Sequence, residues 1–215
     1  MTYRRVLAPL ALLLLAAACA GTNMRDSWVA PNFQKASIKK VLVLGIASNT
    51  GIRRTYEDDF ATTLEGRGYE AIPGYLWVPD ATKLDKDAVV ARMKEEGVTH
   101  VLVTRLVSTQ KVEHHAPSSS NVVVTVGVSG YGPAYYGGWT TYYSTAYSDM
   151  NSAGYTTVDD VVTLETNLYD ASRKPDDAIV WSGHSETWVD GPASGAEIKK
   201  VISAIVYRMR ADRAL

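Results

Sequence analysis

KVLVLGI, residues 40–46, is a continuous apolar run of mainly branched side chains. Such a run predicts a strand that is buried on both faces of a sheet. A long strand is expected over residues 98–112, with Val101, Val103 and Leu106 at its centre, and a shorter strand over residues 69–75. The sequence therefore predicts three neighbouring strands in the first half of the chain.

Helices are expected between these strands. Four apolar residues spaced four apart predict the first helix: Ile52, Tyr56, Phe60 and Leu64. Thr55 is the expected N-terminal cap of this helix, and Gly66 and Gly68 are expected to end it. A second helix is expected to begin at Asp85 and end before Gly97. This alternation of strands and helices predicts parallel pairing through right-handed crossovers, with strand 40–46 between the other two.

The second half predicts an antiparallel hairpin and a final helix. Residues 158–170 alternate between two sets, the first being Val162, Leu164, Thr166 and Leu168, the second Thr163, Glu165, Asn167 and Tyr169. With residues 178–188 returning alongside, the pattern predicts a hairpin with one face in water. Ser194 and Glu197 form a capping box that begins a helix over residues 194–210. The predicted class is α/β (α+β), a mixed five-stranded sheet with three helices in a single domain over residues 38–215.

The N-terminus has the three parts of a secretion signal. Arg4 and Arg5 are followed by an apolar run over residues 6–15 and by three alanines at 16–18. The run is too short for a membrane span, which needs ~20 apolar residues. The stretch ends at Cys19 and resembles the bacterial lipobox. This implies that residues 1–18 are removed and that Cys19 carries a diacylglycerol; ordinary cleavage near a cysteine is the alternative. Residues 19–37 are polar and are expected to form an irregular tether.

Composition limits the classes of partner. The chain has 215 residues, 22 of them basic and 23 acidic, so loss of Arg4 and Arg5 leaves a net charge of about −3. A chain without basic surplus is not expected to bind nucleic acid. The expected membrane contact is the lipid anchor at Cys19, and since Cys19 is the only cysteine, no disulfide within the chain is possible.

Residues 114–148 contain no Asp, Glu, Lys or Arg and are rich in Gly, Tyr, Ser and Thr. They belong to a predicted insertion at residues 116–155. Three interpretations are open: a surface loop, a contact surface for an envelope protein or glycan, and a hairpin that enters a membrane on oligomerisation. Tyrosine and tryptophan suit contact surfaces and membrane interfaces. The candidate partner-binding residues form an aromatic cluster: Tyr135, Tyr136, Trp139, Tyr142 and Tyr143.

Catalytic and metal chemistry is not expected. His114 and His115 are adjacent, so on a strand they would point to opposite faces. The same reasoning applies to His184 and its neighbours Ser185 and Glu186, whose side chains cannot converge as a hydrolase triad. We therefore predict no enzyme activity, metal site or cofactor. His100 is expected to be a hydrogen-bonded residue at a strand end.

Two charged groups near the first helix have alternative interpretations. Arg53 and Arg54 could attract an anion, but pairing with Glu57 and Asp58 one turn later is the favoured interpretation. The consecutive acids Glu57, Asp58 and Asp59 are expected to lie in solvent at the helix start.

A family resemblance adds a fold and a location. The segments VLVLGIASNTGIRRTYEDDF (41–60), GYEA (68–71) and GVTHVLVTRLV (97–107) resemble uncharacterised bacterial lipoproteins. Their domain is similar to the N-terminal domain of the TolB translocation protein and to the core of the curli-secretion lipoprotein. The closing hairpin, IVWSGHSETW (179–188), fits a pattern common in small exported lipoproteins.

The resemblance implies a non-enzymatic outer-membrane lipoprotein that faces the periplasm, with an envelope-assembly or binding role. Ala20 after the cysteine, in place of an Asp, points to the outer membrane. The alternative is a subunit of an oligomeric secretion channel, and a small periplasmic hydrolase is the third hypothesis.

Overall fold

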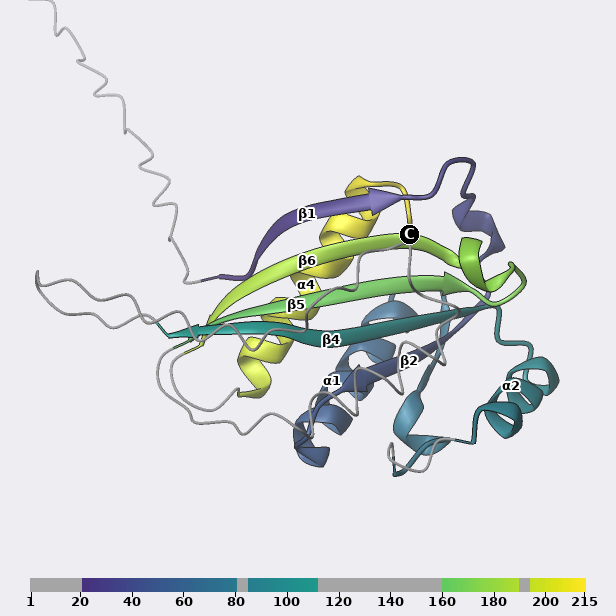
Figure 1. Cartoon of the computed structure of the whole chain (residues 1–215), viewed down its shortest axis with the longest axis horizontal. Coiled ribbons are helices and arrows are strands. Elements are labelled where there is room, and N and C mark those ends of the chain that lie inside the picture. Colours follow the sequence, from purple (N-terminus) through teal and green to yellow (C-terminus); the bar gives the residue numbers. More distant parts are fainter. Residues whose placement is uncertain (1–20, 81–84, 112–159, 190–193) are drawn as a thin grey trace, which may run out of the picture.

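The computed structural model describes residues 21–80, 85–111, 160–189 and 194–215 (Figure 1). These residues form one mixed sheet with the strand order β1-β6-β5-β4-β2-β3. The strands are β1 (Asn23–Val29), β2 (Lys40–Ile46), β3 (Glu70–Pro73), β4 (His100–Lys111), β5 (Asp160–Asp170) and β6 (Ile179–Val189). The α-helices in the described ranges are α1 (Thr50–Glu65), α2 (Lys86–Glu95) and α4 (Gly195–Ala211).

The parallel half of the sheet confirms the predicted arrangement. β2 lies between β3 and β4 and is parallel to both, with Val41 opposite Ala71 on one side and His100 on the other. The apolar run of β2 is buried throughout from Val41 to Ile46, as a central strand requires. β3 is shorter than expected because the chain turns at Gly74 into the 3-10 helix η2 (Gly74–Leu76).

Helices α1 and α4 lie side by side on one face of the sheet (Figure 1). They form a common apolar core with alternate residues of the strands, in which Phe60, Leu102, Leu168 and Ile202 are at most 1% exposed. The second apolar cluster lies on the opposite face, where Val89 and Met93 of α2 pack with residues of β2 and β4. Beyond β4, this second cluster includes Tyr169 of β5 and Ala178, with Ile179 at the start of β6 packed against it, so it covers only part of that face.

The helix ends follow their capping residues. Asn49 caps α1 by accepting hydrogen bonds from the backbone N–H groups of Gly51 and Ile52 at 2.8 and 3.1 Å. The predicted cap at Thr55 is therefore wrong, because Asn49 begins the helix more than one turn earlier and Thr55 lies inside it. Asp85 caps α2 as predicted, and the predicted capping box of Ser194 and Glu197 at α4 is confirmed.

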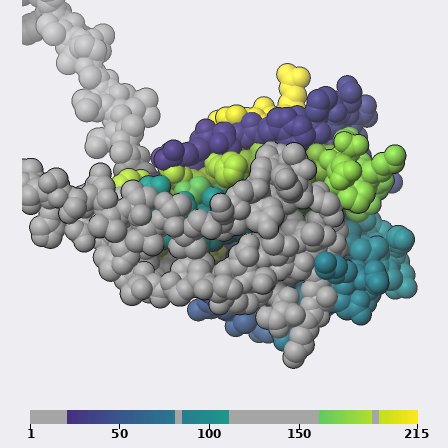
Figure 2. All heavy atoms as spheres, in the orientation of Figure 1, coloured from purple at the N-terminus to yellow at the C-terminus, as the bar shows by residue number. Residues whose placement is uncertain are grey.

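Within the described residues the sheet has six strands, one more than the sequence predicts. The additional strand, β1, lies within residues 19–37, which the sequence predicts to be an irregular tether. It pairs antiparallel with β6 at the sheet edge, and Figure 2 shows it in purple along the outer edge of the molecule. A register shift between Met24 and Asp26 breaks the period of two. This irregularity, together with mainly polar residues, hides the strand from a periodicity search.

The hairpin of β5 and β6 is antiparallel, as predicted. The sequence predicts that the face with Glu165, Asn167 and Tyr169 is in water, but part of that face is buried. Glu165, Asn167 and Tyr169 alternate on that face and are 5%, 0% and 0% exposed. Tyr169 belongs to the apolar cluster with α2, and Glu165 pairs with an arginine of β4.

Candidate functional site

Four ionisable side chains form a row across four strands on the face opposite α1 and α4. The register places Arg105 of β4 opposite Glu165 of β5, Glu165 opposite His184 of β6, and His184 opposite Asp26 of β1. Residues paired directly across strands point to the same face of a sheet. We call these residues the charged row: Arg105, Glu165, His184 and Asp26.

The charged row becomes more exposed toward the sheet edge. Arg105 Nε donates to Glu165 Oε2 at 2.7 Å, and both side chains are 7% exposed. At the other end, His184 Nδ1 lies 2.7 Å from Asp26 Oδ1, and these side chains are 35% and 68% exposed. The inner pair is thus a buried ion pair, while the outer pair offers an imidazole and a carboxylate to a partner from solvent.

Two exposed tryptophans lie on the same face as the charged row. Trp28 of β1 is 49% exposed and lies opposite Ser182 of β6, and Trp188 near the end of β6 is 47% exposed. Since alternate residues of a strand share a face, Ser182, His184 and Trp188 point the same way. Exposed Trp beside charged groups is typical of recognition surfaces, because the indole combines a large apolar area with one polar N–H.

Glu57 forms a buried polar centre on the helix-covered side. Its Oε1 accepts from the Gly45 backbone N–H and from Arg53 Nε, both at 2.9 Å, and its Oε2 accepts from the Tyr75 backbone N–H at 2.5 Å. Burial raises the pKa of Glu57, while the charge of Arg53 and the hydrogen bond from Gly45 oppose that rise. This carboxylate joins β2, α1 and η2, so its role is structural.

The sequence predicted one part of this centre and missed another. The pairing of Arg53 with Glu57 one helical turn later is confirmed. Arg54 has a different contact, with its guanidinium 5.4 Å from the ring centroid of Tyr75. The expectation that Glu57 lies in solvent is wrong, because Glu57 is 0% exposed. Tyr56 and Phe60 pack in the apolar core between α1 and the sheet. Glu57 is adjacent to Tyr56 in the helix and is therefore buried with them.

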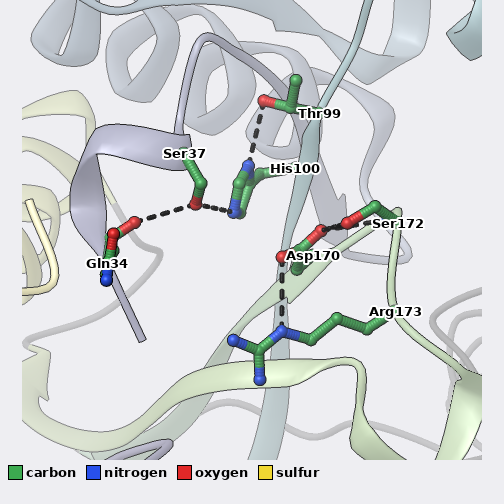
Figure 3. A network of polar contacts seen from close by, with 7 residues as sticks. All are labelled: Gln34, Ser37, Thr99, His100, Asp170, Ser172 and Arg173. Carbon is green, nitrogen blue, oxygen red and sulfur yellow. Dashed lines mark hydrogen bonds and ion pairs between the residues drawn. The ribbon is translucent and has the colours of Figure 1, made fainter. Parts of the chain in front are cut away.

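His100 lies in a polar network at the start of β4 (Figure 3). Its Nδ1 lies 2.9 Å from Thr99 Oγ1, and its Nε2 lies 3.5 Å from Ser37 Oγ. Burial lowers the pKa of His100 to about 4, against the opposing effect of the carboxylate of Asp170. The imidazole is therefore neutral at physiological pH. His100 is 1% exposed, and the prediction of a hydrogen-bonded strand-end residue is confirmed.

Asp170 belongs to the same end of the sheet. Burial tends to raise the pKa of Asp170, but hydrogen bonds from the hydroxyl and backbone N–H of Ser172 outweigh this and hold the pKa below its ordinary value. Arg173 Nε also contacts the carboxylate, at 3.3 Å. The side chains that interact with Asp170 come from the turn that follows β5 and from the start of β4. These contacts close this end of the sheet.

The residues considered as a hydrolase triad occupy different surroundings. His184 contacts Asp26 on the exposed face, whereas Ser185 is 1% exposed. Glu186 of β6 forms an ion pair with Arg25 of β1. No group of three His, Cys, Asp or Glu side chains could hold a metal ion within the part of the chain that the structure describes.

Several predicted residues lie outside the described ranges. These are Cys19, His114, His115 and the aromatic cluster. The insertion at 116–155 connects strands whose described ends, Lys111 of β4 and Asp160 of β5, are opposite each other in the sheet. Among the helices that the structure describes, none is both long and apolar enough to cross a membrane.

Comparisons with known proteins give only distant likenesses. No family model matches the sequence, and no curated protein matches it. A PelC dodecamer from Paraburkholderia phytofirmans is a similar solved structure, with 14% identity over 86% of this chain and 96% of that chain and a TM-score of 0.41.

Two other solved structures are similar at the same level. Lipoprotein GNA1162 from Neisseria meningitidis has 15% identity over 80% of this chain and 99% of that chain, with a TM-score of 0.36. A DUF4136 family protein from Bacteroides thetaiotaomicron has 9% identity over 89% of this chain and 96% of that chain, with a TM-score of 0.37. Likenesses at these TM-scores carry no inference about the activity of this chain.

Proposed function

We propose that the protein is a non-catalytic lipoprotein of the outer membrane that faces the periplasm and binds an envelope partner, a protein or a glycan. The observation that carries the proposal is the secretion-signal pattern of residues 1–18 directly before Cys19, the only cysteine of the chain. A lipid-anchored protein needs no membrane-spanning helix, since several acyl chains on one residue give stable attachment.

Exposed side chains on the sheet face opposite α1 and α4 support the binding role. Trp28 is half-exposed, and the Asp26–His184 pair joins the same two strands, β1 and β6. A surface of this kind combines apolar area with hydrogen-bond donors and acceptors. The aromatic cluster of residues 135–143 is proposed as a second contact region.

The first test concerns the anchor and its location. In cells fed an alkyne fatty acid, the wild-type protein should be labelled and should sediment with outer-membrane density. Cys19→Ser should lose the label and leave the membrane fraction, because no other thiol can accept the lipid. The lipobox usually has Leu three residues before the cysteine, where this chain has Ala16. Ala16→Leu is therefore the matched control and should be labelled at least as well as wild type. A labelled, membrane-bound Cys19→Ser variant would refute the lipid anchor.

The second test concerns the partner. A photo-crosslinking residue placed at Trp28 should form a specific adduct in intact envelopes, whereas the same residue at Tyr207 should not, because Tyr207 lies on α4 and is 77% exposed. Equal adducts at both positions would contradict a binding surface on the face opposite α1 and α4. The alternative, a subunit of an oligomeric secretion channel, predicts instead detergent-stable oligomers that conduct ions in planar bilayers.

The absence of catalysis stays a prediction with its own assay. The purified full-length protein in detergent micelles should give no esterase, peptidase or phosphatase turnover above a blank. Turnover that disappears in a His184→Ala variant would overturn the non-catalytic assignment.

A further inference from the structure

The described domain begins almost at the proposed lipid anchor. Thr22 lies three residues after Cys19, and its hydroxyl is 2.7 Å from the hydroxyl of Thr187 in β6. Consecutive Cα atoms are ~3.8 Å apart, so the Cα of Cys19 is at most ~11 Å from that of Thr22. The acylated residue is therefore held close to one particular end of the sheet.

That end of the sheet is secured by further contacts. Asn23 lies opposite Glu186 in the antiparallel pair of β1 and β6. Arg25, at the register shift, forms an ion pair with Glu186. A flexible tether of ~20 residues would span ~25 Å on average and leave the orientation of the domain free. Here β1 joins the sheet at Asn23, so only three residues, 20–22, separate the anchor from the sheet.

The same end presents an exposed tryptophan. Trp188 follows Thr187 in β6 and is 47% exposed. Trp and Tyr concentrate at the level of lipid headgroups, where one side of the ring is apolar and the other is hydrated. The two charged side chains described beside it, Arg25 and Glu186, neutralise each other and would not repel a lipid surface.

The other exposed tryptophan lies at the opposite end. Trp28 is opposite Ser182, six residues before Trp188 in β6. At ~3.3 Å per residue, this separates the two positions by ~20 Å along the strands. Trp28 and Trp188 share one face and have nearly equal exposure, 49% and 47%. They therefore form a matched pair that differs mainly in distance from the anchor.

We propose that the domain stands upright on the phospholipid surface. The sheet end formed by Asn23, Glu186 and Trp188 contacts the lipid headgroups, and the end that carries Trp28 and His100 points away from the membrane. The proposal rests on the proposed acylation of Cys19 and adds a fixed orientation to it. Because Trp28 then lies away from the lipid, its exposed side chain stays accessible to a partner in the periplasm.

The test uses single labelled cysteines in the full-length acylated protein. Acylation blocks the thiol of Cys19, so Trp188→Cys and Trp28→Cys each take one fluorescent label. In phosphatidylcholine vesicles that contain a lipid with a nitroxide high on its acyl chain, the label at 188 should be quenched at least ~2-fold more than the label at 28. Asn23→Cys is a second proximal position that does not remove a tryptophan, and it should behave like 188.

A linker variant tests the cause of the orientation. An inserted flexible Gly/Ser linker of ~20 residues between Ala20 and Gly21 keeps the anchor but should bring the quenching ratio of positions 188 and 28 toward one. Mass spectrometry separates the possible failures. An unacylated protein would refute the proposed function, whereas an acylated, vesicle-bound protein with equal quenching at 188, 23 and 28 would refute only the upright orientation.

Discussion

Two adjacent rows of side chains cross the same four strands and point to opposite faces of the sheet. The charged row lies on the face away from α1 and α4. A second row consists of the residue next to each of these in its strand. We call it the small row: Thr104, Thr166, Gly183 and Ser27. This second row faces α1 and α4, because alternate residues of a strand point to opposite sides.

The small row brings the helices close to the sheet. The hydroxyl of Tyr56 in α1 is 2.7 Å from the hydroxyl of Thr104, which in turn is 2.9 Å from that of Thr166. Arg208 of α4 donates from its Nε to the hydroxyl of Ser27 at 2.7 Å. Each helix thus hydrogen-bonds directly to a short side chain on the sheet.

The difference between the rows separates stability from the proposed recognition role. Side chains of the small row are enclosed by α1 and α4, so a change there disturbs helix packing. At the outer end of the charged row, His184 and Asp26 are 35% and 68% exposed, so a change there alters what the surface offers to a partner. A strand can carry both tasks because a shift of one residue changes the face.

The largest expected effect comes from a charge placed in the helix-covered core. Ile202 of α4 is 1% exposed and packs in the cluster shared with α1 and the sheet. In Ile202→Asp, burial of an unpaired carboxylate and loss of the apolar side chain should lower the free energy of unfolding by ~4 kcal/mol or more. This is a large part of a typical total of ~5–15 kcal/mol. Circular dichroism should show an unfolded variant at room temperature.

The matched control lies on the same helix. Tyr207 is 77% exposed, so Tyr207→Asp should change the free energy of unfolding by no more than ~0.5 kcal/mol. Equal destabilisation by the two substitutions would mean that α4 does not cover the sheet with the Ile202 side.

The elements predicted well from the sequence are those whose signal is local. The apolar run of β2, the four-residue spacing in α1 and the capping box of Ser194 and Glu197 lie within short windows. The order of β3, β2 and β4 then follows from the handedness of crossovers. These rules depend on neighbouring residues and chain connectivity, so a single sequence contains them.

The features that the sequence did not reveal depend on distant partners. β1 has few apolar residues and a register shift, and it is a strand because β6 offers a free edge. The contact of Asp26 with His184 joins residues 158 positions apart, and Arg105 meets Glu165 across 60 positions. No local spacing encodes such pairs, although the alternating pattern of β5 had already placed Glu165 on the face opposite Leu164 and Thr166.

The second largest effect is a dependence of stability on pH. His100 is on the helix-covered face, beside Thr99 and near Asp170, and its pKa is lowered to about 4. In the unfolded chain the pKa of a histidine is ~6.5. Between these two values the unfolded state binds one proton more, so acid favours unfolding. The titration of His100 therefore leaves the free energy of unfolding unchanged above pH ~6.5 and lowers it as the pH falls from ~6.5 toward 4. By pH ~5 the free energy of unfolding is lower by ~2 kcal/mol.

The His100→Gln variant removes the titrating group and keeps polar atoms near Thr99 and Ser37. Denaturant titrations of wild type and variant at pH 8 and pH 5 isolate the effect, because the other titrating groups are common to both proteins. The loss of stability between these pH values should be smaller in the variant by ~2 kcal/mol. Parallel pH profiles of the two proteins would show that His100 is not held neutral by burial.

The smallest effect compares neighbours that belong to the two rows. A Cβ atom on Gly183 would lie 2.6 and 2.8 Å from ring atoms of Trp181, and Trp181 is fully buried with its Nε1 donating to Asp212 at 2.9 Å. The ring therefore has little freedom to move, and Gly183→Ala should lower the free energy of unfolding by ~1–2 kcal/mol, within the usual range for overpacking. His184→Ala, at the next residue, removes the exposed contact with Asp26 and should change the free energy of unfolding by no more than ~0.5 kcal/mol. Chemical denaturation of the two variants measures the contrast directly, and a larger loss at His184 than at Gly183 would mean that the charged row, rather than the small row, supports the fold.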